Sequence, residues 1–334
     1  MHSRTKRISA ACALCLAGVA ASAQTRLPRE TRNAALRYWF AFAEMQDPPS
    51  DKATAELLEK TAAGEAPWDE AKLGPILDRN EPAILMMQRA TKLPECDWGL
   101  EYSQGARGSV AYAPKARVLA RLNTLYGMRL LSRGDAQGAV DTWLAGVRFS
   151  QHVTEGGPLI FPLIGRAVLL PDLHALAQAA QHGLLSAAQK KQIESVVRAI
   201  PETGFDWSKA VRMEEAGLEA EVHGWALSSN PYAYYQESWG YGTARAGLSK
   251  ENFTVPKESD LESLRKYMNG SAEALRLPPD SARERLQALE PIRKALHPAL
   301  QEMAPSLLHA NEARTEIQAA RQTLLQAMPA PENH

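Results

Sequence analysis

The segment ARVLARLNTLYGMRLLSRGDAQGAVDTWLAGVRFSQHV, residues 116–153, decides the fold class of this chain. Apolar residues recur every three or four positions on both sides of Arg133-Gly134-Asp135. That spacing is typical of amphipathic α-helices. Gly134 can end the first helix, and the Asp135 side chain can cap the second. The segment therefore predicts a hairpin of two helices.

Most of the remaining chain has the same helical period, and strand-like alternation is absent over any useful length. Residues 158–182 are apolar on every face in their first half, which predicts a central, buried helix. Residues 93–113 lack a helical period and are predicted to form an ordered loop. The other predicted helices span residues 30–46, 51–63, 80–91, 186–200, 206–225, 258–275, 281–296 and 306–328. We therefore expect an all-α fold, a multi-helix array or distorted bundle of stacked helical hairpins.

The N-terminus has the pattern of a cleaved secretory signal peptide. Basic residues within positions 1–7 precede an apolar run at 8–20, and Ala21-Ser22-Ala23 is a small-x-small site. The run of about 13 residues is too short to cross a bilayer as a helix. We expect cleavage near Ala23 and a periplasmic or secreted protein.

Removing residues 1–23 leaves a single predicted helical domain, 24–328, and a frayed tail, 329–334. The removal takes three basic and no acidic residues, so 38 basic and 38 acidic residues become 35 and 38, a net charge of −3. This weakly acidic balance argues against nucleic-acid binding. No apolar run of 18 or more residues remains, so we expect no membrane span in the mature chain.

Cys96 is the one cysteine left after that cleavage, so an intrachain disulfide is excluded. A lone cysteine is more often a small buried apolar side chain than a nucleophile. HExxH, GxSxG, P-loop, GxGxxG and paired CxxC motifs are all missing from the sequence. The common hydrolase and metal-binding classes therefore have no sequence support, and no cofactor or metal is predicted.

The hairpin at 116–153 resembles a single tetratricopeptide-like repeat, with a Gly-Asp connector and a small residue at Ala139. The resemblance covers about 40 of the 334 residues, and no further copies follow at the spacing of 34 residues that such repeats need. With the leader and the Cys96-Asp97-Trp98-Gly99 segment, the chain is similar to exported all-helical bacterial proteins of unassigned function. The resemblance implies stacked hairpins and no particular partner.

One predicted helix, DWSKAVRMEEAGLEAEVHGW at 206–225, carries two carboxylates on its apolar face. Glu214 and Glu221 fall inside the arc formed by Trp207, Val211, Leu218, Val222 and Trp225 at about 100° per residue. A buried carboxylate without a partner costs several kcal/mol or takes up a proton. Arg166, surrounded by apolar residues in PLIFPLIGRAVLL, is the predicted partner in a structural ion pair.

An alternative use of Glu214 and Glu221 is catalysis. Two carboxylates about 10 Å apart along a helix can divide the roles of acid and base, as in an inverting glycoside hydrolase. Gly217 lies between them and leaves room for another backbone or a ligand. The opposite face carries Glu215, Glu219 and His223 at successive i, i+4 positions. That set is interpreted as a solvated face rather than a metal site.

The stretch HGWALSSNPYAYYQESWGYG, residues 223–242, concentrates tyrosine and tryptophan. It belongs to a segment, 226–256, that is long for an irregular connection, and such loops are often functional. Tyr232, Tyr235 and Trp239 either fold back over the helices or line a ligand pocket above Glu214 and Glu221.

Together these patterns favour an exported, non-enzymatic binding or scaffold protein for a peptide, a protein or a cell-wall component. The first alternative is a hydrolase that uses Glu214 and Glu221 beneath the aromatic segment. The second is an assembly protein whose aromatic segment meets another subunit.

Overall fold

The computed structural model describes residues 30–101, 110–239 and 248–328. The chain divides into a first unit, Met1–Arg32, and a second unit, Asn33–His334. Only residues 30–32 of the first unit are described, and every described helix belongs to the second unit.

Helices are the regular elements of the described residues, and the one β-type contact there is an isolated bridge between Asn33 and Glu95. This confirms the all-α fold class. In chain order the helices are α2 (Ala34–Glu44), α3 (Lys52–Ala62), α4 (Glu70–Ala90), α5 (Tyr112–Ser132), α6 (Ala136–Val153), α7 (Ile160–Gln181), α8 (Ala187–Ala199), α9 (Trp207–Leu227), α10 (Pro231–Trp239), α11 (Glu258–Ala274), α12 (Pro279–Lys294), α13 (Pro298–Met303) and α14 (Leu308–Gln326).

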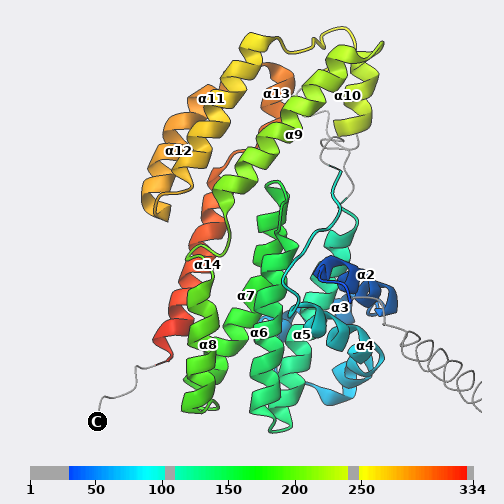
Figure 1. Cartoon of the computed structure of the whole chain (residues 1–334), viewed down its shortest axis with the longest axis vertical. Coiled ribbons are helices and arrows are strands. Elements are labelled where there is room, and N and C mark those ends of the chain that lie inside the picture. The colour runs from blue at the N-terminus through cyan, green and yellow to red at the C-terminus, as the bar shows by residue number, and fades with distance from the viewer. Residues whose placement is uncertain (1–29, 102–109, 240–247, 329–334) are drawn as a thin grey trace, which may run out of the picture. The chain divides into compact units, whose positions relative to one another are not determined.

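Helices that follow one another in the chain tend to pack together, as in α5–α6, α6–α7 and α11–α12. The hairpin predicted from residues 116–153 is α5 and α6, which lie side by side in Figure 1. Gly134 turns the chain with φ +85°, a conformation that favours glycine. The Asp135 carboxylate then accepts a hydrogen bond of 2.8 Å from the Gly138 N–H and caps α6. Both predicted roles are confirmed.

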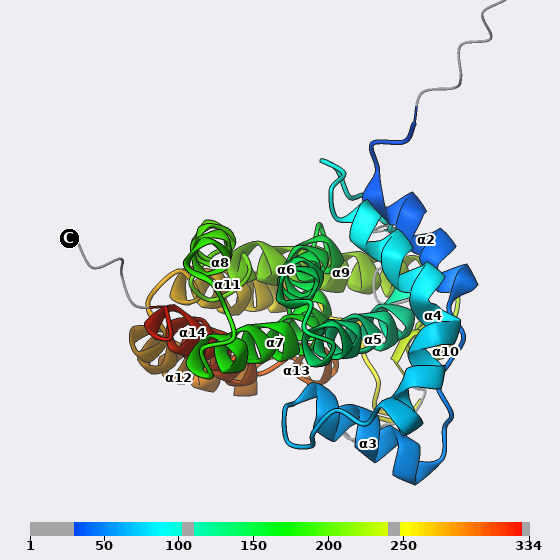
Figure 2. The ribbon, with the colours of Figure 1, turned by 90° about the horizontal axis from the view of Figure 1, so that it is seen from below.

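Helix α7 is the central helix that its apolar sequence predicted. It packs against α5, α6, α9 and α14. Within the described residues it is the one helix whose length and composition would suffice to cross a membrane, and 56% of the apolar window that passes this test is buried in the fold. Figure 2 shows α2 and α4 on the far side of α5 from α14.

Some boundaries differ from the sequence predictions. Helix α4 begins at Glu70 rather than near residue 80, because the Asp69 side chain caps it by accepting from the Lys72 N–H. The predicted irregular segment 226–256 contains α10, and α13 was not predicted. Each of these two helices begins at a proline, Pro231 or Pro298. Proline is favoured at the first helical position, where its missing N–H has no partner to lose.

Candidate functional site

Glu214 lies on α9 and meets the N-terminus of α7. Its carboxylate accepts a hydrogen bond of 3.0 Å from the backbone N–H of Leu159, the residue that precedes α7. No side chain of its own caps α7 there. Burial raises the pKa of Glu214, and the bond from Leu159 opposes that shift. A carboxylate at this position also complements the positive end of the helix dipole.

Arg166 has a different partner from the one predicted. Its guanidinium pairs with the carboxylate of Glu316 on α14, and both side chains remain partly exposed. The predicted ion pair with Glu214 is therefore wrong. The reason is that α14 packs along α7 and brings Glu316 to the surface position of Arg166. Glu221 lies on the inward face of α9 as expected and is 2% exposed.

The polar face of α9 is partly covered. Glu219 pairs with Arg265 of α11, and Glu215 accepts a 3.2 Å hydrogen bond from the Asn269 side chain of the same helix. The interpretation as a solvated face holds for His223, which is exposed, and is corrected for Glu215 and Glu219, which are half-buried because α11 packs along α9. Within the described residues, no group of three or more His, Cys, Asp or Glu side chains is placed to hold a metal ion.

The aromatic residues of α10 pack on α9. Tyr235 is 6% exposed, and its ring centroid lies 5.4 Å from that of Trp225 and 5.0 Å from that of Phe253. The half-buried Tyr232 donates a long hydrogen bond of 3.4 Å to the Leu248 carbonyl. The side chain of Trp239 lies outside the described residues. Tyr235 thus covers the helices, while ligand binding by Tyr232 or Trp239 stays a prediction.

Cys96 belongs to a segment that is held against the C-terminal end of α6 by hydrogen bonds and ring stacking. Trp98 donates from its indole N–H to the His152 carbonyl at 2.7 Å, and its ring stacks on Tyr112 with centroids 3.8 Å apart. Tyr112 in turn donates to the Val153 carbonyl at 3.0 Å. Burial raises the pKa of the Cys96 thiol to about 12. The thiol is therefore protonated at neutral pH, which favours the structural interpretation over a nucleophile.

A buried acid that sequence reasoning missed lies in the middle of α7. Asp172 is 0% exposed, and the Thr124 hydroxyl lies 2.7 Å from its Oδ1. Its Oδ2 has no hydrogen-bond partner among the described residues. Burial raises the pKa of this carboxyl well above its usual range. Beside it, the Gln88 amide donates to Asn123 and Thr142.

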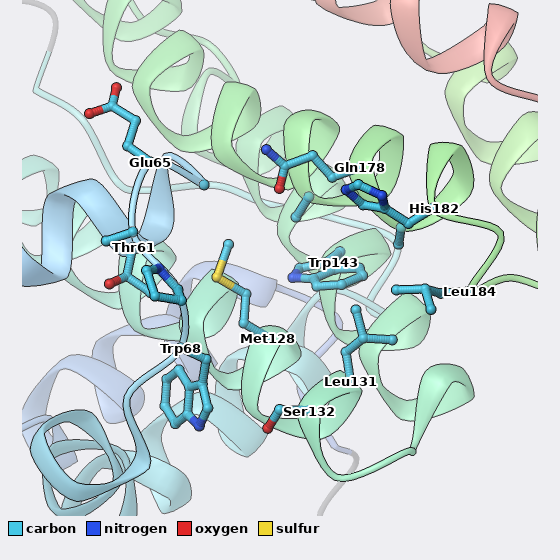
Figure 3. A pocket seen from close by; sticks show the side chains of 15 residues that line it. Thr61, Glu65, Trp68, Met128, Leu131, Ser132, Trp143, Gln178, His182 and Leu184 are labelled. Atoms are coloured by element: carbon cyan, nitrogen blue, oxygen red, sulfur yellow. The ribbon is translucent and has the colours of Figure 1, made fainter.

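The apolar pocket is a cavity of about 570 Å³ bordered by the end of α3, the connection to α4, and α5, α6 and α7. Figure 3 shows Met128 between Trp68 on one side and Trp143 on the other, with Leu184 at the rim. Its walls are completed by Thr61, Gly64, Glu65, Ala66, Pro67, Leu131, Ser132, Ala175, Gln178, Ala179 and His182. Most of these side chains are apolar, as is usual in ligand pockets.

One polar group on the wall of the apolar pocket stands out. Thr61 is 0% exposed, and its hydroxyl has no hydrogen-bond partner among the described residues. Such a buried, unsatisfied hydroxyl costs about 1–3 kcal/mol. The indole N–H of Trp143, by contrast, is fixed by a 3.0 Å bond to the Thr124 carbonyl. The apolar pocket thus has an aromatic wall that a hydrogen bond holds in place, and the Thr61 hydroxyl is buried behind that wall.

The cationic pocket is a second cavity, of about 350 Å³, between α3, α5 and α7. Its charged or titratable side chains are Arg117, Arg121, Arg166, His174 and Glu59. The remaining wall is made of small or apolar residues: Ala62, Ala63, Ala120, Ala167, Val168, Leu170 and Pro171. Neither Glu214 nor Glu221 lines either pocket.

Comparison with protein-family models, with curated proteins and with solved structures gave no match for this chain. The function of this chain is therefore inferred from its side chains and its pockets.

Proposed function

We propose that the protein is a non-enzymatic, exported binding protein that encloses the apolar part of its ligand in the apolar pocket. The observation that carries this proposal is a cavity of about 570 Å³ lined by Trp68, Met128 and Trp143. Pockets of about 300–1,000 Å³ with mostly apolar walls and few polar groups are typical small-ligand sites.

The chemistry of the candidate catalytic residues supports binding over catalysis. Glu214 accepts a hydrogen bond from the N-terminus of α7. The raised pKa of Cys96 means that its side chain is a thiol rather than the nucleophilic thiolate at neutral pH. Export is supported by the signal-like pattern of residues 1–23. The α5–α6 hairpin, similar to one tetratricopeptide-like repeat, forms one wall of the pocket. An apolar side chain of a peptide, or the apolar part of a cell-wall component, fits such a site.

A hydrolase that uses Glu214 and Glu221 is the second candidate. The observation in its favour is that burial raises the pKa of Glu214, because a raised pKa is the direction that a general acid requires. If this candidate is right, hydrolysis of some glycan or peptide by the wild type is abolished in Glu221→Gln. Screening both proteins against such substrates is the test.

The binding proposal is tested by titrating the protein with dodecan-1-ol, a neutral apolar probe, by calorimetry below its solubility limit. We expect binding by the wild type and loss of about tenfold or more in Leu184→Asp, because an apolar ligand would cover this side chain and covering an unpaired carboxylate is costly. Leu184 is 50% exposed, so the change is tolerated by the fold. Leu277→Asp is the matched control, since that leucine is 41% exposed and lies outside the pocket. Absence of binding by the wild type, or equal loss in both variants, refutes the proposal.

A further inference from the structure

The apolar pocket and the cationic pocket lie next to each other along the same pair of helices. Helix α5 gives Arg117 and Arg121 to the cationic pocket and, farther along, Met128 and Leu131 to the apolar pocket. Helix α7 follows the same order, with residues 166–174 lining the first and 175–182 the second. The two helices pack together. From Arg117 to Leu131 the axis of α5 advances about 20 Å, at 1.5 Å per residue.

The last turn of α3 forms the boundary between the two pockets. Ala62 and Ala63 line the cationic pocket, while Thr61 and Gly64 line the apolar one. Gly64 approaches α7 closely, since a Cβ added there would lie 2.3 Å from Nε2 of Gln178. The unsatisfied Thr61 hydroxyl belongs to the same turn. This turn packs against α7 and separates the two pockets, so a ligand that occupies both must lie across it.

The charges of the cationic pocket are not balanced. Arg166 is neutralised by Glu316, and Glu59 is the one acid on the wall. Arg117 and Arg121 have neither a hydrogen-bond nor an ion-pair partner within the described part of the chain. Like charges four residues apart on one helix repel each other. An anion between the two guanidinium groups removes that repulsion, and arginine pairs well with carboxylate or phosphate.

His174 adds a hydrogen-bonding group rather than a charge to this pocket. Burial lowers its pKa from the usual value, so the imidazole is neutral at neutral pH. The net charge of the wall thus comes from the arginines of α5 and is positive.

We infer that the ligand is a single-chain anionic amphiphile, with its unbranched tail in the apolar pocket and its carboxylate or phosphate head at Arg117 and Arg121. This inference rests on the proposed binding function and assigns a chemical class to its ligand. The paired cavities, one apolar and one positive, match the two ends of such a molecule.

The test measures the affinity of the whole protein for dodecanoate, dodecyl phosphate and dodecan-1-ol, each below the concentration at which it forms micelles. We expect at least one of the two anions to bind about tenfold or more tightly than the alcohol, as one or two charge-assisted hydrogen bonds provide. Arg117→Gln with Arg121→Gln should abolish this preference and leave the affinity for the alcohol unchanged. The control is Arg283→Gln with Arg285→Gln, which removes two exposed charges from α12, outside the pocket. This double variant should keep the preference for the anions over the alcohol.

The outcomes separate this inference from the function on which it rests. Equal affinity for the alcohol and both anions overturns the anionic head but keeps the binding function. Inorganic phosphate or acetate that binds as tightly as its dodecyl counterpart overturns the role of the tail. The two anions compared with each other identify the head group, and Leu184→Asp should weaken all three long-chain probes alike.

Discussion

Glu214 on α9, which is half-buried, and Asp172 on α7, which is fully buried, are carboxyl groups with different hydrogen-bond partners. Glu214 accepts from the backbone N–H of Leu159. Asp172 meets only the Thr124 hydroxyl, and its second oxygen has no partner among the described residues. Burial raises the pKa of both groups, and more strongly that of Asp172.

The difference follows from the position of each carboxyl group relative to a helix end. The first N–H groups of a helix have no partner within that helix, so the start of α7 offers Glu214 a donor. Asp172 sits in mid-helix, where the neighbouring backbone groups are already bonded. Protonation is the remaining way to lower its cost. The Thr124 hydroxyl, which donates to Oδ1 of Asp172 at 2.7 Å, opposes the rise of the pKa but does not outweigh the effect of burial.

The largest effect is expected from Gly146→Ala on α6, which crowds Asp172. The added Cβ would lie 1.8 Å from Oδ2 of Asp172 and 2.9 Å from Nδ2 of Asn123. We expect a loss of about 2–3 kcal/mol in the free energy of unfolding, typical of an overpacked core, measured by urea denaturation. In an Asp172→Ala background the same change should cost less. An equal cost in both backgrounds would show that Asp172 is not the group being crowded.

Asp172→Asn should stabilise the protein at neutral pH. The raised pKa means that the folded state binds the proton more tightly than the unfolded state, whose pKa is about 3.9. The contribution of Asp172 to stability is therefore largest below about pH 4 and is lost as the pH rises toward the raised pKa. The amide does not titrate, so we expect Asp172→Asn to be more stable than the wild type at pH 7 by about 1 kcal/mol or more, since one unit of pKa shift corresponds to about 1.4 kcal/mol.

The measurement is the pH dependence of unfolding for both proteins. The difference between them should shrink as the pH falls toward 4. A difference that stays constant with pH would mean that Asp172 does not titrate abnormally.

Glu214→Ala should cost about 1 kcal/mol, the usual effect of losing an N-terminal cap. Glu214→Gln retains an oxygen acceptor for the Leu159 N–H and should cost less than half as much. Thermal unfolding of both variants checks this order. If the Gln variant is as unstable as the Ala variant, the negative charge rather than the hydrogen bond sustains the contact.

The smallest effect is expected from Gly217→Ala, on α9 one turn beyond Glu214. No heavy atom lies within 4 Å of an added Cβ there. Gly217 therefore leaves open space, as expected, but no described group packs in that space. Alanine is favoured over glycine in helix interiors by about 0.5–1 kcal/mol. We expect a gain of that size in urea denaturation, and a loss would indicate a neighbour that packs on Gly217.

The sequence shows that Glu214 lies on an apolar helix face but gives no sign that Asp172 is buried, for a physical reason. Helix α9 is amphipathic, so a carboxylate on its apolar face breaks a visible period. Helix α7 is apolar on nearly all sides, and an aspartate directly after Pro171 has the composition of a helix start or a turn. Similarly, the proline that opens α10 is compatible with a turn as well as with a helix.

The sequence was sufficient to predict the all-α class, the α5–α6 hairpin with its turn at Gly134, and the cap at Asp135. These features depend on neighbours within about four residues, which a sequence shows directly. Tertiary packing was needed to show that Arg166 meets Glu316, that Glu214 caps α7, and that residues of α3, α5 and α7 line both pockets. Such contacts join residues far apart in the chain, and helical periodicity gives the face on which a side chain lies but not the helix that packs against it.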